Sequence, residues 1–188
     1  NNQLVYIYPS EGDNDTSGAS GGILIYGAQV EELSYATSYI PTYGTVRTRL
    51  QDSVNGAGTS SDFNDSEGVL FAEISALADD ENSRLIAISD GTSSNRVCVG
   101  YSGVSNTINV FITRGGVAQA NINYAIGDSS IPQKIAFKYK LNDVALWVNG
   151  IEVATETVSD VPLNLNTSTF SSGSGASPFF GKTSQVQV

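Results

Sequence analysis

Short apolar segments recur along this chain every eight to twelve residues, separated by clusters of Gly, Asn, Asp and Ser. Each segment is four to eight residues long and is rich in Val, Ile, Phe and Tyr, which favour β-strands. Helical periodicity is nearly absent from the sequence. The pattern predicts an all-β chain whose antiparallel strands pack as a β-sandwich.

The predicted strands account for most of the regular structure of the chain. Residues 75–82 are the one segment whose pattern favours a short helical turn or a loop. The predicted strands are residues 4–8, 22–29, 45–49, 68–74, 84–89, 96–101, 107–114, 117–124, 133–140, 144–148, 151–155 and 177–181.

A hairpin at Asn149-Gly150 is the best-specified local feature of the sequence. Both residues accept the positive φ angles of a type I′ turn, so a two-residue loop pairs Val148 with Ile151. Strand alternation then predicts one core face and one opposite face for this hairpin and the strand before it. The predicted core face carries Ile135, Phe137, Tyr139, Val144, Leu146, Val148, Ile151 and Val153, and the opposite face carries Lys138, Trp147 and Glu152.

Residues 50–66 contain almost no apolar side chains and have the composition of a loop or linker. We therefore expect three parts: residues 1–50 as a head of terminal strands, 51–65 as a linker and 66–188 as the sandwich. The head has too few strands to bury a face alone, so it is expected to pack on the body or to complete an upstream module. The chain begins without Met and stops in a strand-like run, and it is expected to be a fragment or a processed product.

The head contains the run Gly27-Ala-Gln-Val-Glu31-Glu-Leu-Ser-Tyr35-Ala-Thr-Ser-Tyr39-Ile-Pro41-Thr42, followed by Thr45-Val-Arg47-Thr-Arg49. This segment resembles one that recurs in bacteriophage tail and fibre proteins, where it closes a carbohydrate-binding-module-like jelly roll. The differences are mild: Val30 stands for the usual Leu, and Glu32-Leu33 stands where a residue followed by Gly is usual.

The body resembles laminin-G-like, concanavalin A-like domains through four short motifs in the same order and spacing. They are residues 68–73, 134–138, 145–150 and 179–182, read as Gly-Val-Leu-Phe-Ala-Glu, Lys-Ile-Ala-Phe-Lys, Ala-Leu-Trp-Val-Asn-Gly and Phe-Phe-Gly-Lys. In that family the strand near Gln185 usually continues into a short helical tail, so the stop at Val188 is a departure. The two resemblances together imply a jelly-roll sandwich in a phage tail or fibre, with other virion proteins as partners and a homotrimeric assembly.

Composition excludes several classes of function. The formal net charge of -10 repels nucleic acid and anionic membrane surfaces, and no Lys/Arg cluster opposes it. No apolar run approaches the length of a membrane-spanning helix. The chain contains no His, which removes His-based acid/base chemistry, and strand 68–74 offers Glu73 as its one internal carboxylate where sandwich glycosidases need a pair. The sequence therefore predicts a protein that is not an enzyme.

Calcium is the one cofactor that the sequence leaves open. Ca²⁺ takes six to eight oxygen ligands, and laminin-G-like domains often bind it near the rim of the sandwich. The loop carboxylates Asp79, Asp80 and Asp90 are the candidate ligands, beside Glu81, Asn82 and Asn95. No EF-hand spacing is present, and solvated acidic loops explain the same residues.

A saccharide site needs an aromatic ring for the C–H face of a pyranose and polar groups for its hydroxyls. Trp147 is the first candidate ring, with Lys138 and Glu152 as its expected neighbours, and Tyr101 is the second. The competing interpretation is that the head or a neighbouring subunit covers Trp147.

Three functions remain open from the sequence. The first is a structural and adhesive module of a phage tail or fibre, located in the virion, that binds host-surface polysaccharide. The second is a carbohydrate-binding module of a secreted or cell-surface bacterial polysaccharide-degrading enzyme. The third is a depolymerase.

Overall fold

The computed structural model describes residues 39–41, 43–45, 47, 55–158 and 160–188. The chain divides into two compact units, Asn1–Arg49 and Leu50–Val188. The predicted strands at residues 4–8 and 22–29, and most of 45–49, lie outside the described residues. The second unit carries the ten strands described below.

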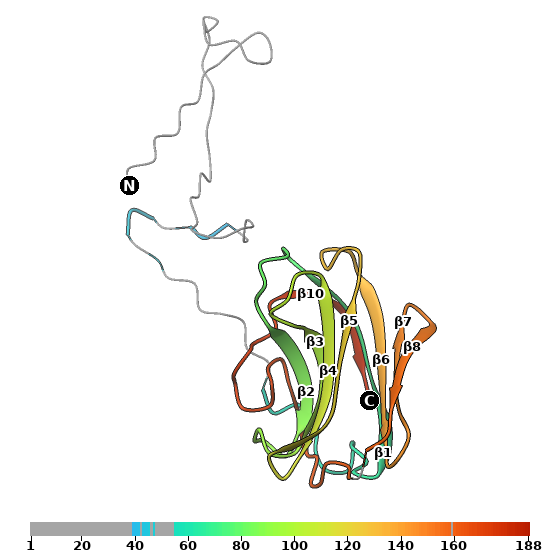
Figure 1. The fold of residues 1–188 in the computed structure, drawn as a ribbon. Helices are drawn as coiled ribbons and strands as arrows, with labels where there is room; N and C mark the ends of the chain where they lie inside the picture. The colour runs from blue at the N-terminus through green and yellow to red at the C-terminus, as the bar shows by residue number, and fades with distance from the viewer. Residues whose placement is uncertain (1–38, 42, 46, 48–54, 159) are drawn as a thin grey trace, which may run out of the picture. The chain divides into compact units, whose positions relative to one another are not determined.

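Two five-stranded antiparallel sheets face each other in the second unit (Figure 1). One sheet has the order β10-β1-β6-β7-β8 and the other has the order β5-β4-β3-β2-β9. The all-β antiparallel sandwich predicted from the sequence is confirmed. The strands are β1 (Glu67–Ala76), β2 (Arg84–Ser89), β3 (Arg96–Tyr101), β4 (Thr107–Arg114), β5 (Val117–Ala125), β6 (Gln133–Lys140), β7 (Val144–Val148), β8 (Ile151–Glu156), β9 (Thr167–Thr169) and β10 (Gly181–Gln187).

The core lies between the inner faces of the two sheets. In β6, buried residues alternate with residues of greater exposure, as expected for a strand with one face inward. Phe137 in β6 pairs with Leu70 in β1 and with Leu146 in β7, and all three are fully buried. The core residues of the opposing sheet are Ile86, Ile88, Val97, Val99, Tyr101, Ile108, Val110, Ile112, Ala120 and Ile122.

Five strands, β2, β3, β4, β6 and β7, begin and end at the predicted residues. The prediction for residues 177–181 is wrong: Pro178 makes an isolated parallel bridge to Leu85, and the strand begins at Gly181. Proline has no N–H to donate to a ladder, so a strand that continues through it is disfavoured. The short polar strand β9 was not predicted, and residues 77–83 form a loop without a helical turn.

The hairpin between β7 and β8 has the predicted turn. Asn149 and Gly150 have φ angles of 52° and 85°, as a type I′ turn requires, and Val148 pairs with Ile151. A register shift between Leu146 and Trp147 then pairs Leu146 with Ala154. The predicted core position of Ile151 is wrong, because Ile151 directly follows the exposed turn and is 68% exposed. Val153, the unpaired residue of this β-bulge, is partly buried and packs against the core.

The described part of the segment predicted as a linker packs against the sandwich. The Asp65 carboxylate accepts hydrogen bonds from the backbone N–H groups of Asn164 and Leu165, at 2.8 and 2.9 Å. The Tyr139 hydroxyl donates to the Asn64 carbonyl at 2.7 Å, and Phe63 packs on the core. Residues 63–65 therefore close one end of the sandwich.

Cys98 provides a direct test of how tightly the second sheet is covered. It is fully buried on β3, and burial raises the pKa of its thiol to about 12, with a smaller opposing effect from Arg96. We expect native Cys98 to react with iodoacetamide at pH 8 about a thousandfold more slowly than the same thiol in guanidinium, because only the thiolate attacks. Mass spectrometry of timed samples measures both rates, and rapid alkylation of the native protein would contradict this burial.

Candidate functional site

The outer face of the sheet β10-β1-β6-β7-β8 carries the ring that the sequence singled out. Trp147 in β7 lies opposite Ala136 in β6 and Glu152 in β8, and its side chain is half-buried. Lys138 follows Ala136 by two residues on β6. Its Nζ lies 5.6 Å from the centroid of the Trp147 ring. The structure therefore brings Trp147, Lys138 and Glu152 together on one face.

Lys138 is held in place by two contacts. Its ammonium forms an ion pair with Asp143, while its distance to Trp147 is within the range of a cation–π contact. The side chains of Lys138 and Asp143 are 29% and 52% exposed. At this exposure the ion pair contributes little to stability, so its main effect is to position a cation beside the ring.

An open hollow lies beside this cluster. It has a volume of about 550 Å³ and is lined by Asn142, Asp143, Val144, Thr155, Glu156 and Thr157. Asp143 contacts both the hollow and Lys138, and Thr155 pairs with Ala145 next to Trp147. Carboxylate, amide and hydroxyl groups of this kind accept and donate hydrogen bonds to sugar hydroxyls. We call Trp147, Lys138, Glu152 and this hollow the Trp147 surface.

The sequence prediction missed the residues of the hollow. Asp143 and Thr155 look like ordinary turn and strand residues in the sequence. The turn between β6 and β7 places Asp143 against Lys138, and the pairing of β7 with β8 places Thr155 opposite Ala145. The available signal was the hairpin register, which also fixes Trp147 opposite Glu152.

The prediction of Tyr101 as a second sugar platform is wrong. Tyr101 is 3% exposed, and its hydroxyl donates a hydrogen bond to the Ile74 carbonyl at 3.0 Å. Burial raises the pKa of this hydroxyl well above its ordinary value. Its ring lies in the core because Val97, Val99 and Tyr101 alternate onto the inner face of β3.

The predicted calcium ligands do not come together. Asp79 and Asp80 lie in the loop before β2, and Asp90 follows the end of β2, so the strand separates them by roughly 20 Å at 3.3 Å per residue. Within the part of the chain that the structure describes, no group of three His, Cys, Asp or Glu side chains is arranged to hold a metal ion.

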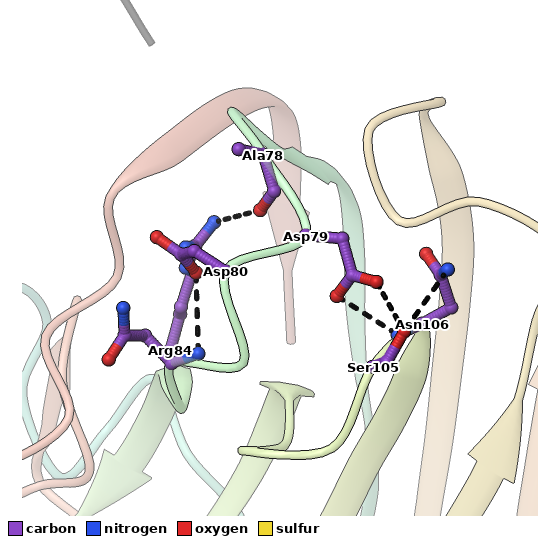
Figure 2. Close-up of polar contacts among 7 residues, drawn as sticks. Ala78, Asp79, Asp80, Arg84, Ser105 and Asn106 are labelled. Atoms are coloured by element: carbon purple, nitrogen blue, oxygen red, sulfur yellow. Dashed lines mark hydrogen bonds and ion pairs between the residues drawn. The ribbon is translucent and has the colours of Figure 1, made fainter. Parts of the chain in front are cut away.

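Each of the three carboxylates already has protein partners. Figure 2 shows Asp79 accepting hydrogen bonds from the Ser105 hydroxyl and from the Asn106 N–H, the latter at 3.1 Å. Asp80 forms an ion pair with the buried Arg84, whose Nη1 also donates to the Ala78 carbonyl at 3.1 Å. The loop before β2 is thus organised by bonds within the protein.

Asp90 caps the turn after β2. Partial burial alone would raise the pKa of Asp90, but hydrogen bonds from Thr92 and Asn95 outweigh it and hold the pKa below its ordinary value. The Thr92 hydroxyl and the Asn95 side-chain amide donate to it at 2.6 and 2.8 Å. These bonds keep Asp90 ionised as a structural acceptor.

The carboxylate of Glu73, the one acid inside strand 68–74, has no second acid directly across the sheet. Its neighbours in register are Lys134 on β6 and Gln185 on β10. A glycosidase needs two carboxylates that flank the scissile bond.

No helix within the described residues is long and apolar enough to cross a membrane.

Part of this chain is similar in structure to several solved proteins. No family model and no curated protein matches the chain. Domains LG4-5 of the mouse laminin alpha1 chain are 9% identical, with a TM-score of 0.44, over 62% of this chain and 31% of that one. A variant of human galectin-16 is 11% identical, with a TM-score of 0.44, over 64% of this chain and 87% of that one.

A mutant of the NanB sialidase from Streptococcus pneumoniae is 17% identical, with a TM-score of 0.48, over 72% of this chain and 24% of that one. The chain thus spans about a third of the laminin structure and about a quarter of the sialidase. Structural similarities at these identities and TM-scores assign no function to the chain. The fold is defined by the order of the strands in the two sheets. The second unit is an antiparallel β-sandwich.

Proposed function

We propose that the chain is a non-catalytic, carbohydrate-binding module of a bacteriophage tail or fibre that attaches to host-surface polysaccharide. The observation that carries the binding function is the Trp147 surface, where a half-exposed indole lies beside a fixed cation, a carboxylate and a polar hollow. A pyranose ring stacks on such an indole while its hydroxyls bond to the polar rim.

The virion location is supported by the resemblance of the head segment, residues 27–49, to phage tail and fibre proteins. The alternative is a carbohydrate-binding module of a secreted bacterial polysaccharide-degrading enzyme, in which the same surface would tether the enzyme to its substrate. The full reading frame separates the two: neighbouring tail genes favour the virion, and a fused glycosidase or lyase domain favours the enzyme.

Replacing Trp147 by alanine is expected to weaken polysaccharide binding about tenfold, because the lost stacking contributes about 1.4 kcal/mol. The measurement is binding of the purified chain to an array of bacterial capsular and O-antigen polysaccharides, followed by titration with the best binder. Val104→Ala is the matched control, since Val104 is 64% exposed in a loop outside the Trp147 surface.

Two results would oppose this proposal. Equal affinity of Trp147→Ala and the unmodified chain would show that the sugar binds elsewhere. Absence of binding to every polysaccharide on the array and to host cells would reduce the module to an architectural role.

A further inference from the structure

A second polar surface lies on the outer face of the other sheet, which the Trp147 surface does not include. The register of β4 and β5 places Asn109 opposite Asn123 and Phe111 opposite Asn121. Asn121 and Asn123 are exposed, and Asn109 and Phe111 are half-buried. These four side chains form a compact patch of three amides and one aromatic ring, which we call the asparagine patch.

The three amides fix one another's orientation. The Asn109 Nδ2 donates to the Asn121 Oδ1 at 2.7 Å, to the Asn123 Oδ1 at 3.1 Å and to the Ile122 carbonyl at 3.4 Å. A backbone carbonyl can only accept, so the amide of Asn109 must turn its nitrogen toward these oxygens. The Oδ1 atoms of Asn121 and Asn123 then face the Asn109 nitrogen, and their Nδ2 groups are directed away from Asn109.

The asparagine patch therefore presents donors in a fixed arrangement. The contacts of the described residues include no protein acceptor for the Nδ2 groups of Asn121 and Asn123. Groups held by their own hydrogen bonds lose little conformational entropy when a ligand binds, and this preorganisation favours affinity.

Arg96 adds a fixed positive charge to this patch. Its Cζ lies 4.9 Å from the centroid of the Phe111 ring, and its Nη1 donates to the Ser172 carbonyl at 2.5 Å. Arg84 and Arg114 are both paired with carboxylates, Asp80 and Asp160. Among the described residues, Arg96 has no carboxylate partner, although the chain has 19 acidic residues.

The three strands around Arg96 carry no acidic residue of their own. The sequence between Asp90 and Asp128, which includes β3, β4 and β5, contains no Asp or Glu. An anionic ligand on this sheet face therefore meets no acidic side chain from β3, β4 or β5; the nearby carboxylates are Asp90, which is bonded to Asn95, and Asp160, which is paired with Arg114. A guanidinium of fixed orientation binds a carboxylate through two parallel hydrogen bonds.

We propose that the asparagine patch and Arg96 form a second binding site, for a saccharide that carries a carboxylate. The amides bond to hydroxyl groups, and the Arg96 guanidinium, which lies over the Phe111 ring, pairs with the carboxylate. The site lies on a different sheet from Trp147, so ligand binding at this site can be tested separately from binding at the Trp147 surface.

The test is isothermal titration calorimetry of the full chain with two acidic probes, hexagalacturonate and a hyaluronan hexasaccharide, each beside its carboxyl-reduced form. We expect at least one acidic probe to bind at least tenfold more tightly than its reduced form. Arg96→Gln should remove this preference, and Asn121→Asp, which is isosteric and exposed, should weaken binding of the acidic probe at least tenfold. Thermal unfolding of each variant checks that the fold is retained.

Val104→Ala serves as the control, because Val104 is 64% exposed in a loop outside both surfaces and its truncation should leave binding of the acidic probes unchanged. A loss of binding in Trp147→Ala with full binding in Arg96→Gln would place the sugar on the Trp147 surface and overturn the second site. Equal affinity for the acidic and reduced probes, or binding of neither, also overturns it.

Discussion

Replacing Phe137 by alanine is expected to lower the free energy of unfolding by about 3–5 kcal/mol. The ring of Phe137 is fully buried between Leu70 and Leu146, its partners on the two flanking strands. Truncation removes its apolar contacts and leaves a cavity that well-packed neighbours fill only in part. Urea denaturation followed by circular dichroism measures the change.

Phe111→Ala is the matched control for this substitution. Phe111 lies on the outer face of β4 and is half-buried, so its truncation leaves no enclosed cavity. We expect it to cost less than Phe137→Ala by at least about 1.5 kcal/mol. Equal costs at the two positions would mean that the core does not lie between the sheets as described.

Asp80→Ala is expected to destabilise the fold by about 3 kcal/mol, because it leaves the guanidinium of Arg84 buried without its counter-ion. The Arg84 side chain is 1% exposed, and its remaining contacts are the Ala78 carbonyl and the Phe180 ring, with Cζ 4.4 Å from the ring centroid. Thermal and urea unfolding of the variant measure the loss. Asp79→Ala, in the same loop, is the control and should cost about 1 kcal/mol, since Asp79 bonds only uncharged groups.

A double substitution separates charge burial from loop disruption. In Asp80→Ala/Arg84→Met the buried charge is gone, so we expect the double variant to be more stable than Asp80→Ala alone. A single Asp80→Ala variant as stable as the unmodified protein would refute the assignment of this ion pair as the neutralising partner of Arg84.

The sequence was sufficient to predict the sandwich wherever local signals agreed with tertiary packing. The Asn149-Gly150 turn fixed a register, and that register correctly placed Trp147 opposite Glu152 with Lys138 nearby. The prediction failed at Ile151, which pairs with the buried Val148 but lies beside the exposed turn, where no other strand covers it.

The errors at the candidate site have equally physical causes. Tyr101 was the second candidate ring for a sugar, yet its alternation with Val97 and Val99 places it on the inner face of β3. Asp80 and Asp90 are near in sequence, but the extended strand between them places them at opposite ends of β2. The asparagine patch was not foreseen, because its residues come from two strands whose register only the structure supplies.

The position of β1 has a mechanical consequence. β1 is the first strand of the two sheets, and it is an interior one, with β6 hydrogen-bonded along one edge and β10 along the other. A pull applied through the preceding chain, along the axis of β1, therefore loads both ladders in shear and cannot peel the strand away from one side. A sandwich loaded through such a strand resists mechanical unfolding.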